Sequence, residues 1–220
     1  MGKLILVRHG HTFLNVPGRD ERLRGWLDIP LDEQGLREAH DTAQLLVDYP
    51  VHTIYTSDLR RARQTAEILR RRTCATRVVA SKELRPWNVG VFAGQRVSDI
   101  LPFLNLLNRH PDLAAPSGES FYQFYGRYSR RLVELMNLSL ESPGYVLAVT
   151  HVRNLLAAKT IIAQGDPAQV PVKGGPTTGT LTVVEKRNGI WRMQPVDHRL
   201  AVVPAPVLQG ESSLARQESA

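Results

Sequence analysis

The chain has 220 residues and a formal net charge of +7, with 28 lysines and arginines against 21 aspartates and glutamates. Charged residues make up 22% and hydrophobic residues 42%, a globular composition that argues against a disordered chain. The only cysteine, Cys74, excludes an intramolecular disulfide and a cysteine-based zinc site. The basic excess suggests an anionic partner and leaves nucleic acid, acidic lipid and phosphorylated metabolites open.

Targeting and membrane signals are absent from the sequence. The apolar run at residues 4–7 is too short for a signal peptide, and Arg8 and His9 follow it at once. No apolar stretch approaches the roughly 20 residues that a bilayer span requires. We therefore expect a cytoplasmic protein with no membrane partner.

The first half of the chain alternates short apolar runs with amphipathic stretches, which indicates strands followed by helices. In order, these are a strand at 4–7, a loop at 15–31, a helix from Asp32, a strand at 53–55, a helix with Ala62, Thr65, Ala66 and Leu69 on one face, a strand at 78–80, and a loop at 86–94.

The second half continues this alternation and ends in a hairpin. In order, its elements are a helix at 97–108, a break at 111–118, a helix with an aromatic core stripe at 121–136, a strand at 145–149, a helix at 155–163, a loop at 171–179, and strands at 180–185 and 191–194. Asn188-Gly189 between the last two strands is a strong hairpin signal. We expect one domain over 1–203 and a flexible tail over 204–220.

Strands that alternate with helices predict an α/β fold with a largely parallel sheet. Such sheets place binding sites at the carboxyl ends of their strands. Two of the predicted strands run directly into a histidine, His9 after residues 4–7 and His151 after residues 145–149. This coincidence is the first functional signal in the sequence.

The first of these strand ends carries residue types suited to phosphate chemistry. Arg8 supplies a planar fork of donors that matches a phosphate group. His9 can attack phosphorus and form a covalent intermediate, which splits one difficult step into two. Gly10 lets the backbone approach a ligand closely.

These residues resemble the histidine phosphatase superfamily, the phosphoglycerate mutase-like proteins. Any single motif is weak, but several occur in the family's order and spacing from about residue 3 to about residue 195. They are Leu6-Val7-Arg8-His9-Gly10-His11-Thr12 with Asn15, residues 25–31 leading to Gly35, residues 56–66, Gly118-Glu119-Ser120, and Val149-Thr150-His151. The resemblance implies a three-layer α/β/α sandwich with a mainly parallel sheet and no metal or organic cofactor.

The resemblance also assigns roles to individual residues. His9 matches the nucleophile that becomes phosphohistidine, and His151 matches a second histidine that contacts the phosphate. Arg8 and Arg61 match the two arginines that clamp the phosphoryl group. The expected substrate-binding residues are Asn15, Thr12, Arg24, Gly25 and Val152.

One position departs from the family pattern in a way that matters for the chemistry. Pro86 stands where the family carries the glutamate that acts as general acid for the leaving group. Loss of a positioned acid typically costs about 10²–10⁴ in rate. Either Glu119 or Glu83 replaces it, or the substrates need no acid, or the site binds phosphorylated ligands with little turnover.

We therefore expect a phosphatase that hydrolyses a small phosphomonoester through a phosphohistidine on His9. Phosphoglycerate mutase-type transfer is one alternative, and a phosphate-binding regulatory module is another. Nucleic-acid binding is not expected, because no aromatic-interleaved basic motif is present. Residues 57–85 carry most of the net positive charge, and we interpret them mainly as a solvated helix face.

Overall fold

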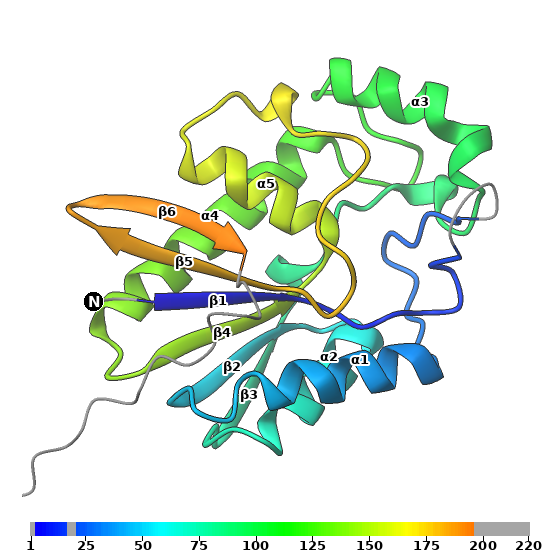
Figure 1. Cartoon of the computed structure of the whole chain (residues 1–220). Helices are drawn as coiled ribbons and strands as arrows, with labels where there is room; N and C mark the ends of the chain where they lie inside the picture. The colour runs from blue at the N-terminus through cyan, green and yellow to red at the C-terminus, as the bar shows by residue number, and fades with distance from the viewer. Residues whose placement is uncertain (1–2, 17–20, 196–220) are drawn as a thin grey trace, which may run out of the picture.

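The computed structural model describes residues 3–16 and 21–195, which form a sheet between layers of helices (Figure 1). Its strands are β1 (Lys3–Arg8), β2 (Val51–Ser57), β3 (Arg77–Ser81), β4 (Tyr145–Thr150), β5 (Leu181–Arg187) and β6 (Ile190–Pro195). Its α-helices are α1 (Glu33–Gln44), α2 (Arg60–Arg70), α3 (Val97–Arg109), α4 (Phe121–Glu141) and α5 (Val152–Ile162). Short 3-10 turns cover η2 (Lys82–Leu84), η3 (Gly90–Phe92) and η4 (Pro167–Gln169).

The sheet is mainly parallel, as the sequence predicts. The strand order is β3-β2-β4-β1-β5-β6. Strands β3, β2, β4 and β1 run parallel, and the β5–β6 hairpin adds two antiparallel strands beside β1. The chain passes from β1 through α1 to β2, and β4 later inserts between these two strands. The direction in which strands are added to the sheet therefore reverses, and a crevice for ligands forms at the carboxyl ends of the strands at that point.

Alternating residues of the central strands pack into two hydrophobic cores, one on each face of the sheet. On one face, Leu4 and Leu6 of β1 pack with the buried side chains of α4 and α5. On the other face, Ile5 and Val7 pack with those of α1 and α2. Figure 1 shows these helix pairs on opposite sides of the sheet, so the predicted three-layer α/β/α arrangement is confirmed.

Two of the helices, α1 and α4, begin at side chains that cap them. Asp32 caps α1, with its carboxylate accepting from the Gly35 N–H at 2.8 Å. Ser120 and Gln123 form a reciprocal capping box at the start of α4. The aromatic stripe of α4 is core, as predicted, because Phe121, Phe124 and Tyr128 are fully buried.

Strands β1 and β4 are aligned so that their polar ends meet. Arg8 pairs with Thr150 in the ladder. The His9 N–H then donates to the Thr150 carbonyl oxygen at 3.0 Å. This register brings His9 and His151 to the same point of the sheet.

Several elements differ from those expected, most of them by a few residues at their ends. Helix α5 begins at Val152 rather than at residue 155, because His151 serves as its N-terminal flanking residue and the helix starts as soon as β4 ends. Strand β2 spans Val51–Ser57 rather than residues 53–55, since parallel neighbours pair with it on both sides. The predicted loop at 86–94 contains the short turn η3, closed by Gly90 with a φ of +51°.

Other expectations are confirmed or fall outside the described residues. The Asn188-Gly189 turn joins β5 to β6, and both residues have positive φ angles. Within residues 3–16 and 21–195, no helix is long and apolar enough to cross a membrane. The predicted tail at 204–220 lies outside the part of the chain that the structure describes.

Candidate active site

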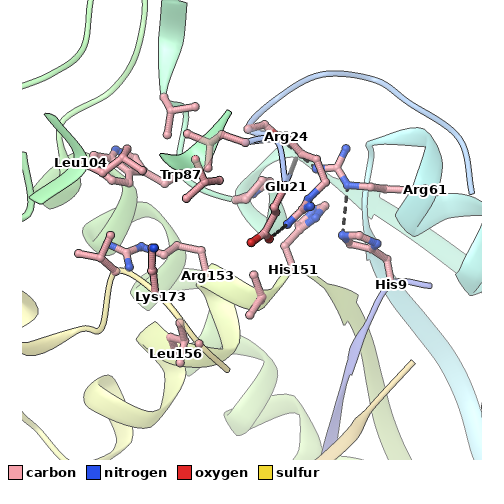
Figure 2. A pocket seen from close by; sticks show the side chains of 18 residues that line it. His9, Glu21, Arg24, Arg61, Trp87, Leu104, His151, Arg153, Leu156 and Lys173 are labelled. Atoms are coloured by element: carbon pink, nitrogen blue, oxygen red, sulfur yellow. Dashed lines mark hydrogen bonds and ion pairs between the residues drawn. The ribbon is translucent and has the colours of Figure 1, made fainter. Parts of the chain in front are cut away.

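A cavity of about 280 Å³ opens at the carboxyl ends of β1 and β4. His9, Arg61 and His151 lie at one end of it, with Arg24 and Glu21 beside them (Figure 2). The wall is otherwise largely apolar and includes Leu23, Pro86, Trp87, Val89, Val97, Leu104, Leu156 and Val172. The cavity therefore has a cationic end, and the rest of its wall is largely apolar.

The His9 ring is buried and held by hydrogen bonds at both nitrogens. Its Nδ1 lies 2.7 Å from the Gly10 carbonyl oxygen, which can only accept, so Nδ1 carries the proton. Its Nε2 accepts from the Arg61 Nε–H at 3.2 Å and therefore presents a lone pair. Burial, and then the charges of Arg61 and Arg8, hold the His9 pKa well below the ordinary value for histidine. The ring is thus neutral at physiological pH, as a nucleophile must be.

Arg61 comes from the first turn of α2 and is 1% exposed. Its NH1 and NH2 groups donate to the carbonyl oxygens of Leu27 and Gly25 at 2.7 and 3.0 Å. These bonds fix the guanidinium against His9. Burial, followed by the repulsion of Arg24, lowers the Arg61 pKa to about 9, so the side chain remains cationic at neutral pH.

His151 lies beside His9, with ring centroids 5.0 Å apart in an edge-to-face arrangement. Both of its ring nitrogens are buried and have no hydrogen-bond partner among the described residues. Burial, and then the charge of Arg61, lower its pKa well below the ordinary value. Buried polar groups are normally paired, so these two nitrogens indicate a place for a polar ligand.

Arg8 belongs to the same cationic region without lining the cavity. It donates to the Pro176 carbonyl oxygen through NH1, while its buried Nε has no partner among the described residues. Burial, followed by repulsion from Arg24, lowers its pKa to about 10. The buried Arg61 and the half-buried Arg8 together supply two positive charges near His9.

Arg24 and Glu21 form an ion pair at the cavity wall, with 3.6 Å between the Arg24 NH2 group and a Glu21 carboxylate oxygen. Figure 2 shows this pair above His151. The Arg24 side chain is 11% exposed and that of Glu21 is 44% exposed. The sequence predicted Arg24 as a substrate-binding residue, but nothing in it signalled that Glu21 reaches the same cavity.

The loop after β1 is held in place by close backbone contact with α1. A Cβ atom added to Gly10 would lie 2.4 Å from the Gly35 carbonyl oxygen, which no real side chain tolerates. The Gly10 N–H also donates to the Thr65 hydroxyl of α2 at 3.2 Å. Gly10 is therefore required for the approach that positions His9.

Of the predicted substrate-binding residues, Gly25, Arg24 and Val152 line the cavity, whereas Thr12 and Asn15 do not. The Asn15 side-chain oxygen accepts from the Thr12 N–H at 3.0 Å and from its hydroxyl at 2.8 Å. His11 turns the other way, with its Nδ1 2.6 Å from the Asp32 carboxylate. These residues shape the loop after His9 in the structure, and their contact with substrate stays a prediction.

Pro86, predicted from the family resemblance to stand at the position of the general acid, lines the cavity. Glu119, one candidate replacement, forms an ion pair with Arg127 at 2.6 Å and accepts from the Asn88 N–H at 2.9 Å. It does not line the cavity, and neither does Glu83, which is exposed at η2. Among the described residues, Glu21 is the only carboxylate that does.

Three of the basic side chains around α2 are engaged in ion pairs with two carboxylates. Glu67 pairs with Arg70 and Arg71, and Asp58 pairs with Arg85 at 2.6 Å. Only Arg61 of that region lines the cavity. Within the described residues, no cluster of three or more histidine, cysteine, aspartate or glutamate side chains could hold a metal ion.

The fold and the cavity define a class of protein. It is an α/β protein in which a neutral histidine, held by an arginine at the carboxyl ends of parallel strands, faces a site for an anionic group. The sequence profile of the histidine phosphatase superfamily (branch 1) matches residues 4–197, and the chain belongs to this family. Family membership supports a phosphatase or a mutase-type enzyme.

Individual relatives agree with this assignment. Probable phosphoglycerate mutases GpmB from Yersinia pestis and Yersinia pseudotuberculosis are 32% identical over 148 residues, and the match covers 65% of this chain and 65% of theirs. A mycobacterial glucosyl-3-phosphoglycerate phosphatase structure is 26% identical, covers 88% of this chain and 96% of its own, and has a TM-score of 0.73. A phosphoglycerate mutase structure from Bacillus anthracis shares the fold, with 23% identity, coverage of 91% and 96%, and a TM-score of 0.74.

Proposed function

We propose that this protein is a phosphatase that hydrolyses phosphomonoesters through a phosphohistidine at His9. The observation that carries the proposal is the state of His9, a buried neutral ring whose Nε2 lone pair lies 3.2 Å from the Nε of Arg61. A phosphoryl group seated against Arg61 and His151, with the charge of Arg8 nearby, would have its spread negative charge stabilised by preorganised donors.

The chemistry follows from that geometry in two steps. In the first, the hydrogen bond from Arg61 to the His9 Nε2 atom is given up and its lone pair forms a bond to phosphorus. The bond from phosphorus to the ester oxygen breaks, and that oxygen leaves with the electron pair. The proton stays on Nδ1, and its hydrogen bond to the Gly10 carbonyl oxygen stabilises the phosphorylated ring. In the second, a water oxygen forms a bond to phosphorus, the bond from phosphorus to Nε2 breaks, and Nε2 regains its lone pair. Inorganic phosphate departs, and the proton that the water loses goes to the phosphate or to solvent.

Pro86 decides which substrates suit this site. With no acid at that position, the departing oxygen must leave as an anion or take its proton from water. Aryl and acyl phosphates tolerate this because their leaving groups are stable anions, whereas alkyl phosphates do not. The proposed enzyme therefore favours substrates with good leaving groups.

Turnover of p-nitrophenyl phosphate and a panel of natural phosphomonoesters, measured beside the His9→Ala variant, tests the proposal. We expect turnover that the substitution abolishes, with the variant still folded by its melting transition. Equal residual rates in the two proteins would refute the phosphatase and favour a phosphate-binding module.

A mutase is the second candidate, because relatives that share 32% identity with the chain are named probable phosphoglycerate mutases. Mutase action requires proton transfer to and from the substrate oxygen in both directions, so Pro86 weighs against it. We expect no interconversion of phosphoglycerate isomers. Interconversion that outpaces the release of inorganic phosphate would favour the mutase instead.

A further inference from the structure

The cavity contains a second cationic region that the phosphoryl chemistry does not use. Arg153, in the first turn of α5, lines the cavity and is 9% exposed. Lys173 lines the same wall, two residues after Pro171, whose carbonyl oxygen accepts from Arg153. Figure 2 shows both cations on the side of the pocket away from His9 and Arg61.

Arg153 carries a buried charge that no described carboxylate balances. Its NH2 group donates to the Asn108 side-chain oxygen at 2.9 Å, and its guanidinium packs against Phe121 and Trp87, 4.6 and 5.3 Å from the ring centroids. Its Nε is buried without a partner among the described residues. Burial alone lowers its pKa to about 10, so the group is still cationic at neutral pH.

Keeping such a charge in the protein interior is costly unless an anion compensates it. Arg24, in the same cavity, shows the contrast, because Glu21 balances its charge. Lys173 is exposed and adds a second positive charge to the lining of the same cavity. The positive charges of Arg153 and Lys173 are therefore suited to binding an anionic group of the ligand.

The cavity wall between the two cationic ends determines which kind of group can bind between the two anions of a ligand. Trp87, Leu104 and Leu156 line it, together with Val97 and Val172. An apolar body is favoured there, since burying it releases water from these side chains.

We propose that the substrate is a phosphomonoester with an apolar body and a second anionic group, a carboxylate or a phosphate, that binds at Arg153 and Lys173. The inference rests on the proposed function for the identity of the first group. It goes further by assigning a second anion subsite and a specificity role to two residues.

Binding of non-hydrolysable ligands tests the subsite without relying on turnover. Phenylphosphonate, 4-carboxyphenylphosphonate and 4-(2-carboxyethyl)phenylphosphonate share one phosphonate and differ in the second anion and its reach. We expect at least one of the two carboxylates to bind about tenfold more tightly than phenylphosphonate by calorimetry. Benzene-1,4-diphosphonate distinguishes a phosphate from a carboxylate as the second group.

Substitutions assign that preference to the proposed residues. Lys173→Met removes an exposed charge with little risk to folding, and Arg153→Met removes the buried one. Each is expected to reduce the advantage of the carboxylate several-fold. Lys159→Met, an exposed lysine on the same helix that does not line the cavity, is the matched control and should keep the wild-type ratio.

Equal affinity for all four compounds, or a carboxylate preference that survives Lys173→Met and Arg153→Met, would overturn the second subsite. Neither result touches the phosphatase proposal, which depends on turnover at His9. Conversely, a protein that binds the carboxylates more tightly but turns over no phosphomonoester would keep the subsite and lose the phosphatase.

Discussion

Arg61 donates its Nε–H to the Nε2 atom of His9 across 3.2 Å, while the opposite ring nitrogen of His9 contacts the Gly10 carbonyl oxygen. The two contacts fix the tautomer of the ring and aim its lone pair. The same arginine is anchored to the loop at Gly25 and Leu27. The Arg61 side chain therefore orients the proposed nucleophile and lies where it can bind the incoming phosphoryl group.

Substitution of Arg61 should strongly reduce catalytic activity. Arg61→Ala is expected to lower kcat/KM for p-nitrophenyl phosphate by about 10²–10³-fold, the usual loss for one preorganised donor to a developing charge. Arg61→Lys should recover only part of the activity, since an ammonium cannot reproduce the guanidinium's fork of donors. Arg63→Ala, at an exposed position of the same helix, is the control and should match the wild type. Activity of Arg61→Ala within a few-fold of wild type would contradict this role.

The two buried histidines should make stability sensitive to mild acid. Burial and neighbouring arginines hold the pKa of His9 and of His151 well below the ordinary value, so the unfolded chain takes up protons first as the pH falls. The stabilising contribution is complete above the unfolded pKa of about 6.5 and is lost progressively below it. Between pH 7 and pH 5 the free energy of unfolding should therefore fall, with a contribution from each histidine.

Urea denaturation at several pH values measures this effect. His151→Gln should remove about half of the pH dependence in that range, and a His9→Asn, His151→Gln double variant should remove most of it. A double variant with the wild-type pH dependence would show that other groups are responsible.

Pro86 predicts a steep dependence of rate on the leaving group. Rates should fall sharply across a series of aryl to alkyl phosphates as the pKa of the departing alcohol rises. Pro86→Glu should restore an acid in the cavity wall and raise alkyl phosphate turnover by about tenfold or more, while aryl phosphates change little. A shallow dependence in the wild-type protein would instead mean that another acid operates.

Two variants identify such an acid if the dependence is shallow. Glu21→Gln tests the carboxylate that lines the cavity, and Glu119→Gln tests the one bound to Arg127. Selective loss of alkyl phosphate turnover in either variant would name the residue. Melting transitions separate this from a loss of folding, which is the greater risk at Glu119.

The contact between Gly10 and Gly35 predicts a severe effect from one methyl group. Gly10→Ala would place its Cβ 2.4 Å from the Gly35 carbonyl oxygen, so the loop after β1 must move and take His9 with it. Lower stability and a large loss of turnover are both expected. Gly126→Ala, in α4 and with only a flexible arginine tip 3.7 Å away, is the matched control and should stabilise the protein by roughly 1 kcal/mol.

Equal melting temperatures for wild type and Gly10→Ala would show that the loop adapts without cost. Calorimetric melting of the three proteins under one condition makes the comparison direct.

The sequence predicted the fold class and the meeting of His9 and His151, because both depend on local patterns. Short apolar runs that end in histidine are visible in the chain, and the carboxyl ends of parallel strands necessarily lie at the same edge of the sheet. The extent of β2 was not visible, since its outer residues join the sheet only through pairing with β3 and β4. The start of α5 was missed for a similar reason, as nothing local marks His151 as its flanking residue.

The site was harder to predict where it depends on contacts between distant segments. The acceptor for the His9 ring is the adjacent Gly10 carbonyl oxygen, and no residue pattern in the sequence identifies it. Glu21 and Arg153 had no signal of their own, because their place in the cavity depends on how loops and α5 pack together. For Glu119, the sequence showed a carboxylate near a helix start, and only the structure revealed that Arg127 and Asn88 engage it.

The most direct test of the central claim is to trap and map the phosphorylated protein. The full chain is mixed with an aryl phosphate, quenched within milliseconds, and the phosphoryl group is located by mass spectrometry under alkaline conditions. We expect one phosphoryl group on the His9 ring, stable to base and labile to acid, and none in His9→Ala. Rapid turnover with no base-stable phosphoprotein, or a phosphoryl group on a residue other than His9, would contradict the proposed mechanism.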